Sequence, residues 1–198
     1  MSSTVNIWKL TMTAMLSAIA FVLMFLEFSI PVMPPFIKMD VSELPALLGA
    51  FSMGPVSGVM ICLIKNLLHL LMSTTGGVGE LSNFLLGACF VLPAGILYQQ
   101  KKSKKRAIFG AAFGSLLMAL ASIGSNYYVV YPFYYNFMSE EAVLQAYQLI
   151  VPGVKNILEC LVIFNAPFTL VKGLICVIAT MFIYKPLSPF LKGNYRNR

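Results

Sequence analysis

Long apolar stretches, separated by short polar, glycine-rich or proline-rich breaks, dominate the sequence. A membrane-spanning helix needs about 20 mostly apolar residues, and several stretches approach that length. The first stretch ends at Pro31-Val-Met-Pro-Pro35, because prolines cannot continue a helix. The pattern predicts six transmembrane helices, over about 7–30, 43–53, 55–72, 80–100, 107–131 and 153–185.

The count of six depends on one break. The uncharged run from Leu44 to Ile64 is interrupted by Gly54-Pro55, a strong helix breaker, so we expect two shorter helices joined by a tight turn. Ser42, just before this run, is expected to cap the first of them. Reading 43–72 as a single span gives five helices instead.

The last predicted helix contains a proline within its apolar run. We expect Glu140–Leu149 to be a short amphipathic external segment and Pro152-Gly153 to start the helix, with Pro186 and Pro189 beyond its end. Pro167 lies within it and lacks an amide N–H, so a carbonyl one turn earlier loses its usual donor. The helix should therefore be loosened beside Pro167.

Composition places the chain in a membrane. It is 59% hydrophobic and 11% charged, whereas soluble domains carry about 25% charged residues. We therefore expect an all-α membrane protein with a single transmembrane domain over 1–198. The first apolar stretch lacks a basic leader and a small-residue cleavage site, so it is expected to be a retained helix. The four cysteines are scattered singly, which indicates neither a disulfide framework nor a metal site.

The charges indicate orientation. The net charge is +7, but most cations flank the apolar stretches, which favours contact with lipid phosphates and not with nucleic acid. Basic loops mark the cytoplasmic side, so six helices with cytoplasmic N- and C-termini place every basic cluster inside, whereas five do not. The clusters are Lys9; Lys101, Lys102, Lys104, Lys105 and Arg106; and Lys185, Lys192, Arg196 and Arg198.

Lys172 is the residue that most needs an explanation. A lysine at the centre of a membrane helix costs about 3 kcal/mol on insertion scales, so it indicates a functional site unless it snorkels to an interface. About a dozen uncharged residues on each side make snorkelling difficult. Asn165 and Thr169 share its helix face at i, i+4, i+7 spacing. This face predicts either a ligand edge or hydrogen bonds between helices.

Other polar residues form weaker signals. Asn126 precedes the tyrosine-rich segment 127–135, which suits a planar aromatic ligand or an interfacial aromatic belt with a capping asparagine. His69 is expected to be a buried, hydrogen-bonded histidine. Lys65 is expected to pair with Glu27 or Glu80.

Ala14 and Ala18 form a small-xxx-small pattern that lets another helix approach closely, within the chain or from another subunit. The sequence contains no Walker A motif and no hydrolase motif of the GxSxG or HExxH type. The chain is therefore not expected to be an enzyme. Uphill transport would need partner subunits or an ion gradient.

Several segments together resemble the riboflavin-specific substrate-binding (S) components of energy-coupling factor (ECF) vitamin transporters. The resemblance is carried by Lys38-Met-Asp-Val-Ser-Glu-Leu-Pro-Ala-Leu-Leu-Gly49, Gly54-Pro55, Ile64-Lys-Asn-Leu-Leu-His-Leu-Leu71, Gly76-Gly-Val-Gly-Glu-Leu-Ser-Asn-Phe-Leu-Leu-Gly87, Ser125-Asn-Tyr-Tyr128 and Pro167-Phe-Thr-Leu-Val-Lys-Gly173. It implies a six-helix bundle in a bacterial cell membrane, with an outward vitamin site closed by the loop between the first two helices. It also implies a membrane-embedded coupling subunit and two ABC-type ATPases as partners, with Ala14 and Ala18 matching the AxxxA contact motif.

The resemblance also implies which residues bind riboflavin, which is a transported ligand and not a cofactor. Asn126 and Lys172 match positions at the polar edge of the flavin ring, and Leu44, Met72 and Gly79 match positions that line the site. Family members often have asparagine where this chain has Thr169, so Asn165 or a water is expected to supply the missing amide. An S component for another vitamin, an ion-coupled transporter and an intramembrane enzyme are the alternative functions.

Overall fold

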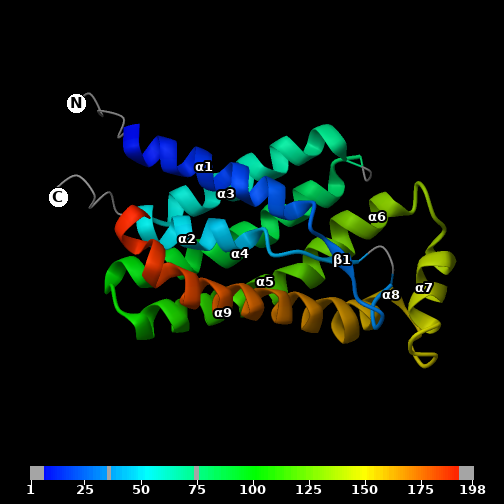
Figure 1. The fold of residues 1–198 in the computed structure, drawn as a ribbon. Helices are drawn as coiled ribbons and strands as arrows, with labels where there is room; N and C mark the ends of the chain where they lie inside the picture. The colour runs from blue at the N-terminus through cyan, green and yellow to red at the C-terminus, as the bar shows by residue number, and fades with distance from the viewer. Residues whose placement is uncertain (1–6, 35–36, 74–75, 192–198) are drawn as a thin grey trace.

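The computed structural model describes residues 7–34, 37–73 and 76–191 and is a bundle of long helices (Figure 1). The helices that run along the bundle are α1 (Ile7–Met24), α2 (Glu43–Met53), α3 (Pro55–His69), α4 (Val78–Gln100), α5 (Lys104–Ser125) and α9 (Ala166–Leu191). Short segments complete the described parts of the chain: strands β1 (Phe28–Ser29) and β2 (Lys38–Met39), the 3₁₀ turn η1 (Leu70–Met72), the π-helical segments η2 (Asn126–Val130) and η3 (Leu161–Asn165), and helices α6 (Tyr131–Tyr134), α7 (Glu140–Gln148) and α8 (Ile157–Cys160).

Five of the helical stretches are long and apolar enough to cross a membrane, and α2 is too short. Eleven residues of helix extend only about 16 Å. Most residues of α2 are buried, because α1, α3, α4 and α9 pack around it. A helix enclosed by other helices need not match the thickness of the lipid, so its short length is compatible with a place inside the bundle.

The two ends of the bundle differ in what they contain. Lys9 on α1, the Gly54-Pro55 turn, and Gln99 and Lys102 at the end of α4 border one small surface pocket. Figure 1 shows the start of α1 and the end of α9 at this same end, and α7 at the opposite end. The first basic residue and the 101–106 cluster therefore lie on the side away from α7.

The segment after α1 differs from the prediction. The helix ends at Met24, not near residue 30, and Phe28–Ser29 then pairs antiparallel with Lys38–Met39. Ser42 does not cap α2, because its backbone is itself helical and its hydroxyl donates to Asp40 and not to an α2 amide. The chain between α1 and α2 is thus a small β-hairpin that carries Asp40 just beyond its second strand.

The last helix also differs from the prediction at both ends. It begins at Ile157 and not at Pro152-Gly153, because Asn156 is the cap and its side chain accepts a hydrogen bond from the Glu159 amide at 2.9 Å. It continues through Pro186 and Pro189 to Leu191. Prolines near the end of a membrane helix are tolerated when a freed carbonyl lies close enough to the surface to meet water.

Two π-helical segments of five residues, η2 and η3, each lie just before a proline. In η2 the amide of Tyr131 bonds to the carbonyl of Asn126, and in η3 the amide of Ala166 bonds to the carbonyl of Leu161, both one residue further back than in an α-helix. Pro132 and Pro167 follow each of these bonds by one residue. The loosening expected beside Pro167 is therefore a π turn, and Pro132 produces a second one that the sequence reading missed.

Candidate functional site

A cavity of about 500 Å³ lies in the half of the bundle nearer α7. That volume is within the usual range of small-molecule sites, about 300–1,000 Å³. Residues from α1, the β-hairpin, α3, α4, α5 with η2 and α6, α7, and η3 with α9 all contribute to its wall. The lining includes apolar and aromatic side chains: Met24, Leu86, Met118, Tyr131, Tyr134 and Phe168.

Lys172 lies at this cavity and forms an ion pair that the sequence analysis did not find. Its Nζ donates to Asp40 Oδ2 at 2.7 Å, and only 9% and 8% of the two side chains are exposed. The lysine comes from α9, and the aspartate comes from the end of the β-hairpin. Lys172 therefore does not snorkel; it has a buried carboxylate partner beside the cavity.

Asp40 is stabilised as an anion. Burial alone raises a carboxyl pKa, but the positive charges of Lys172 and Lys65 outweigh it, and hydrogen bonds from Lys172 and Ser42 add to them. The pKa of Asp40 is therefore held well below its usual range. The carboxylate stays ionised throughout the physiological pH range.

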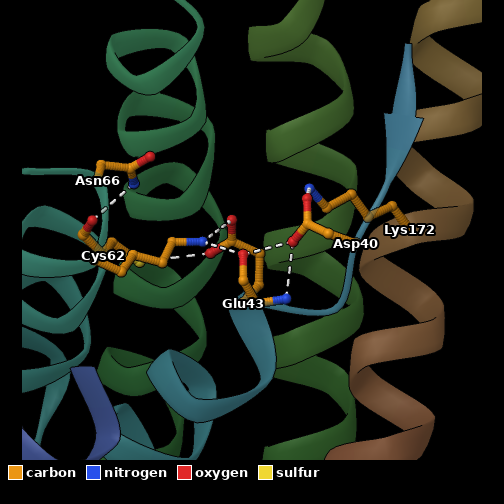
Figure 2. Close-up of polar contacts among 7 residues, drawn as sticks. Asp40, Glu43, Cys62, Asn66 and Lys172 are labelled. Carbon is orange, nitrogen blue, oxygen red and sulfur yellow. Dashed lines mark hydrogen bonds and ion pairs between the residues drawn. The ribbon is translucent and has the colours of Figure 1, made fainter. Parts of the chain in front are cut away.

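A second buried ion pair lies directly behind the first. Lys65 on α3 pairs with Glu43 at 2.8 Å and also donates to the Ser42 hydroxyl at 2.6 Å. That hydroxyl in turn donates to Asp40, so a continuous path runs from Lys65 through Ser42 and Asp40 to Lys172. Figure 2 shows Asp40 on this path, between Glu43 and Lys172. The expectation that Lys65 pairs with Glu27 or Glu80 is wrong.

Glu27 and Glu80 have other partners at the cavity. Glu27 pairs with Lys38 across the β-hairpin, where both side chains are exposed. Glu80 accepts from Ser73 at 2.8 Å and lies 2.8 Å from Nδ1 of His69. His69 is thus hydrogen-bonded, as expected, although its side chain is partly exposed at the cavity.

Asn165 is held by two tyrosines. The Tyr147 hydroxyl donates to Asn165 Oδ1 at 2.8 Å, and Asn165 Nδ2 donates to the Tyr131 hydroxyl at 3.5 Å. The two tyrosine hydroxyls are also hydrogen-bonded to each other. The amide on the Lys172 face therefore has a fixed side-chain network behind it.

The residues singled out from the sequence fall into three groups. Five of them line the cavity: Gly79, Asn126, Asn165, Thr169 and Lys172. Leu44 instead packs against the buried core, and Met72 is 62% exposed on η1, so neither lines the cavity. Ala14 and Ala18 lie exposed on α1.

The tyrosine-rich segment divides between the two roles considered for it. Tyr131 and Tyr134 line the cavity, whereas Tyr127 and Tyr128 are exposed outside it. Asn83 also lines the cavity, and its buried Oδ1 has no hydrogen-bond partner among the described residues. It lies within the segment 76–87 that carries the resemblance, but nothing in its spacing marked it as a cavity residue.

The cavity combines apolar and aromatic lining residues with hydrogen-bond donors and acceptors from the Lys172 face, Asn126 and Asn83. This arrangement suits a planar ligand with one hydrogen-bonding edge. Within the described ranges, no three histidine, cysteine or acidic side chains gather to hold a metal ion. Fold and site together define a helical membrane protein with a small-molecule binding cavity in one half of its bundle.

Residues 8–184 match the family described as the substrate-specific component of ECF transporters. The chain belongs to that family; it is a transport subunit, not an enzyme, and a multi-pass membrane protein.

Individual relatives agree with this assignment. The chain is 37% identical over 185 residues to the riboflavin transporter RibU of Staphylococcus aureus (strain TCH60), covering 93% of this chain and 92% of the relative. It is 31% identical over 187 residues to the riboflavin transporter FmnP of Bacillus subtilis (strain 168), covering 93% and 94%. A solved S component of a bacterial ECF transporter superposes with a TM-score of 0.72 at 36% identity, over 93% of this chain and 97% of that one.

Proposed function

We propose that this protein is the riboflavin-binding S component of an ECF transporter. It captures the vitamin outside the cell and delivers it inward when it is coupled to an energising module. The single observation that carries the proposal is the buried Lys172 at a cavity of about 500 Å³, in a chain 37% identical to a protein named as a riboflavin transporter.

The ring system of riboflavin has one edge of alternating carbonyl and N–H groups, and its ribityl chain carries hydroxyls. Lys172, Thr169 and Asn165 supply the polar edge from α9 and η3, and Asn126 supplies an amide from η2. Gly79 borders the ligand from α4. Leu44 and Met72 are proposed contacts on the family resemblance alone, because neither side chain borders the cavity.

The first experiment asks whether the protein binds the vitamin. Protein purified in detergent from ordinary cells is expected to be yellow and to show flavin absorbance. Stripped protein is expected to quench flavin fluorescence on titration with riboflavin. Colourless protein that quenches no flavin but binds a different vitamin in the same titration format would contradict the proposal.

We propose an orientation with six passes in one transmembrane domain and both termini in the cytoplasm. It is supported by the placement of Lys9 and the 101–106 cluster at the end away from α7, since basic residues favour the cytoplasmic side. A reporter that is active only in the cytoplasm, fused after the C-terminus, is expected to be active. The same reporter inserted in the loop before α7 is expected to be inactive.

The proposed partners are the coupling membrane subunit and two ABC-type ATPases, in the lipid bilayer. Ala14 and Ala18 lie exposed on α1, which leaves a flat surface for another helix. Ala14→Trp with Ala18→Trp is expected to spare riboflavin binding and abolish uptake. If the complex with the partner subunits still assembles with both tryptophans present, the proposed contact surface is wrong.

A further inference from the structure

The short helix α7 lies outside the candidate spans, yet it reaches the cavity. Val143 lines the cavity, and Tyr147, one turn further on, is completely buried with 0% of its surface exposed. The Tyr147 ring packs against Phe164 of η3 at a centroid distance of 5.1 Å. This external helix therefore contacts the segment that leads into the Lys172 face.

The Tyr147 hydroxyl takes part in a closed ring of three hydrogen bonds. Tyr147 donates to Asn165 Oδ1 at 2.8 Å, Asn165 donates to the Tyr131 hydroxyl, and that hydroxyl can then donate to the oxygen of Tyr147. Each group donates once and accepts once around the ring. Burial raises the pKa of Tyr147, so its hydroxyl keeps its proton and remains a donor.

This ring fixes the plane of the Asn165 carboxamide. Of the two N–H bonds on Asn165 Nδ2, one is directed to Tyr131. No second hydrogen bond from Nδ2 to an acceptor is found among the described residues, and Asn165 is a lining residue of the cavity. A side chain held in its binding orientation before the ligand arrives loses less freedom on binding.

We propose that Tyr147 is a positioning residue of the ligand site, which holds the Asn165 carboxamide so that one amide N–H meets the ligand. The proposal rests on the proposed riboflavin function. Tyr147 acts through Asn165, because Tyr147 itself does not line the cavity. The amide that replaces the usual family asparagine is then Asn165, and α7 is part of the binding site.

The test uses the full chain in detergent and riboflavin titration by fluorescence quenching. Tyr147→Phe keeps the packing against Phe164 and removes only the hydroxyl. We expect it to raise the riboflavin dissociation constant about tenfold, the effect of one lost hydrogen bond of about 1.4 kcal/mol. Tyr135→Phe is the matched control, because Tyr135 packs against the buried apolar cluster that contains Tyr147 and Phe164 but does not line the cavity. It should bind riboflavin as the wild type does.

A double-mutant cycle separates positioning from general stability. If Tyr147 acts through Asn165, adding Tyr147→Phe to Asn165→Ala should weaken binding no further than Asn165→Ala alone. The proposal would be overturned if the fold-losses of riboflavin affinity of the two single variants multiply in the double variant. Wild-type affinity in Tyr147→Phe would overturn it as well. Wild-type protein that fails to bind riboflavin would instead refute the proposed function, so the two failures are distinguishable.

Asn165→Asp gives an answer even if Tyr147→Phe does not fold. The carboxylate keeps an oxygen for the Tyr147 hydroxyl and removes the N–H that the ligand is proposed to meet. We expect a folded protein with at least tenfold weaker riboflavin binding. Unchanged affinity in Asn165→Asp would mean that the ligand does not use this N–H, and it would overturn the proposal.

Discussion

The pairs Lys172–Asp40 and Lys65–Glu43 are alike in chemistry and differ in surroundings. Both are buried lysine–carboxylate contacts of 2.7–2.8 Å, and Ser42 connects them. Lys65 and Glu43 are enclosed almost completely, with 0% and 1% of their side chains exposed, and neither lines the cavity. Lys172 and Asp40 both line it.

The surroundings of each pair set what it can do. The Lys65–Glu43 pair has no access to water or to a ligand. It holds α2 against α3, and neither of its groups can exchange its partner for water or a ligand. Gly87 on α4 shows how closely this region is packed, because a Cβ there would lie 2.7 Å from Glu43 Oε2. A pair at a cavity wall can instead share its remaining donors and acceptors with a ligand. The comparison predicts that substitution of Lys65 mainly lowers stability and that substitution of Lys172 mainly lowers ligand affinity.

The largest expected effect comes from removing one charge of the enclosed pair. Lys65→Met keeps an unbranched side chain one heavy atom shorter than lysine but leaves Glu43 buried without a counter-ion, which costs about 3–5 kcal/mol. We expect a large loss of folded protein in detergent, measured by thermal unfolding. Lys65→Met with Glu43→Leu should recover much of the loss, because both charges are then gone. If Lys65→Met is as stable as the wild type, the Lys65–Glu43 pair does not contribute to stability as predicted.

The second effect is on binding. Lys172→Met is expected to weaken riboflavin binding at least tenfold, about 1.4 kcal/mol, because the ligand edge loses its charged donor. Its cost in stability should be smaller than that of Lys65→Met, since Asp40 lies at a cavity where water can solvate it. Titration and thermal unfolding of the two matched lysine-to-methionine variants test this. The opposite ranking, with Lys172→Met the less stable and the tighter binder, would reverse the assignments.

A smaller effect is expected at the residue between the pairs. Ser42→Ala removes an acceptor from Lys65 and a donor from Asp40, which predicts a loss of about 1–2 kcal/mol in unfolding free energy. Ser52→Ala is the control, because the Ser52 hydroxyl bonds only to carbonyls of its own helix among the contacts described. Equal unfolding midpoints for the two variants would show that the link through Ser42 contributes nothing.

The smallest expected effect is the pH dependence of the stability that Asp40 contributes. The pKa of Asp40 is lowered in the folded state, so its contribution to stability is present above the unfolded pKa of about 3.9 and is lost only as pH falls below it. The difference in unfolding free energy between wild type and Asp40→Asn should therefore stay constant from about pH 8 to pH 5. It should shrink below about pH 4. A difference that changes near neutral pH would contradict a lowered pKa.

The α9 side of the cavity could be predicted from the sequence, whereas Asp40, which faces Lys172, could not. Asn165, Thr169 and Lys172 were predictable because they follow regular helical spacing, and all three line the cavity. Asp40 was not, because it lies 132 residues from Lys172 along the chain, in a hairpin that no apolar pattern specifies. Contacts between residues so far apart in the chain depend on how the helices pack, and this packing cannot be read from a single sequence.

The errors at helix ends have local causes. Pro152-Gly153 predicts a helix start, but the last helix begins after Asn156. Asn156 and Glu159, three residues apart, have the spacing of a capping box, which is visible in the sequence. The apolar residues Phe25, Leu26 and Phe28 predict that the first helix extends past Met24, where it ends. Composition alone could not show that Phe28–Ser29 pairs with Lys38–Met39.

The close packing of α5 against α9 and against α4, next to the cavity, has a consequence for transport. A Cβ on Gly173 would lie 2.7 Å from the Ser115 hydroxyl oxygen, and one on Gly114 would lie 2.3 Å from the Phe90 carbonyl oxygen. Both contacts lie next to Lys172 and Met118, on the side away from α7. A solute bound beside Lys172 therefore has packed backbone between itself and the basic end of the molecule. A solute can pass from the cavity toward that end only if these packed helices separate, so the cavity by itself is not a passage through the bundle.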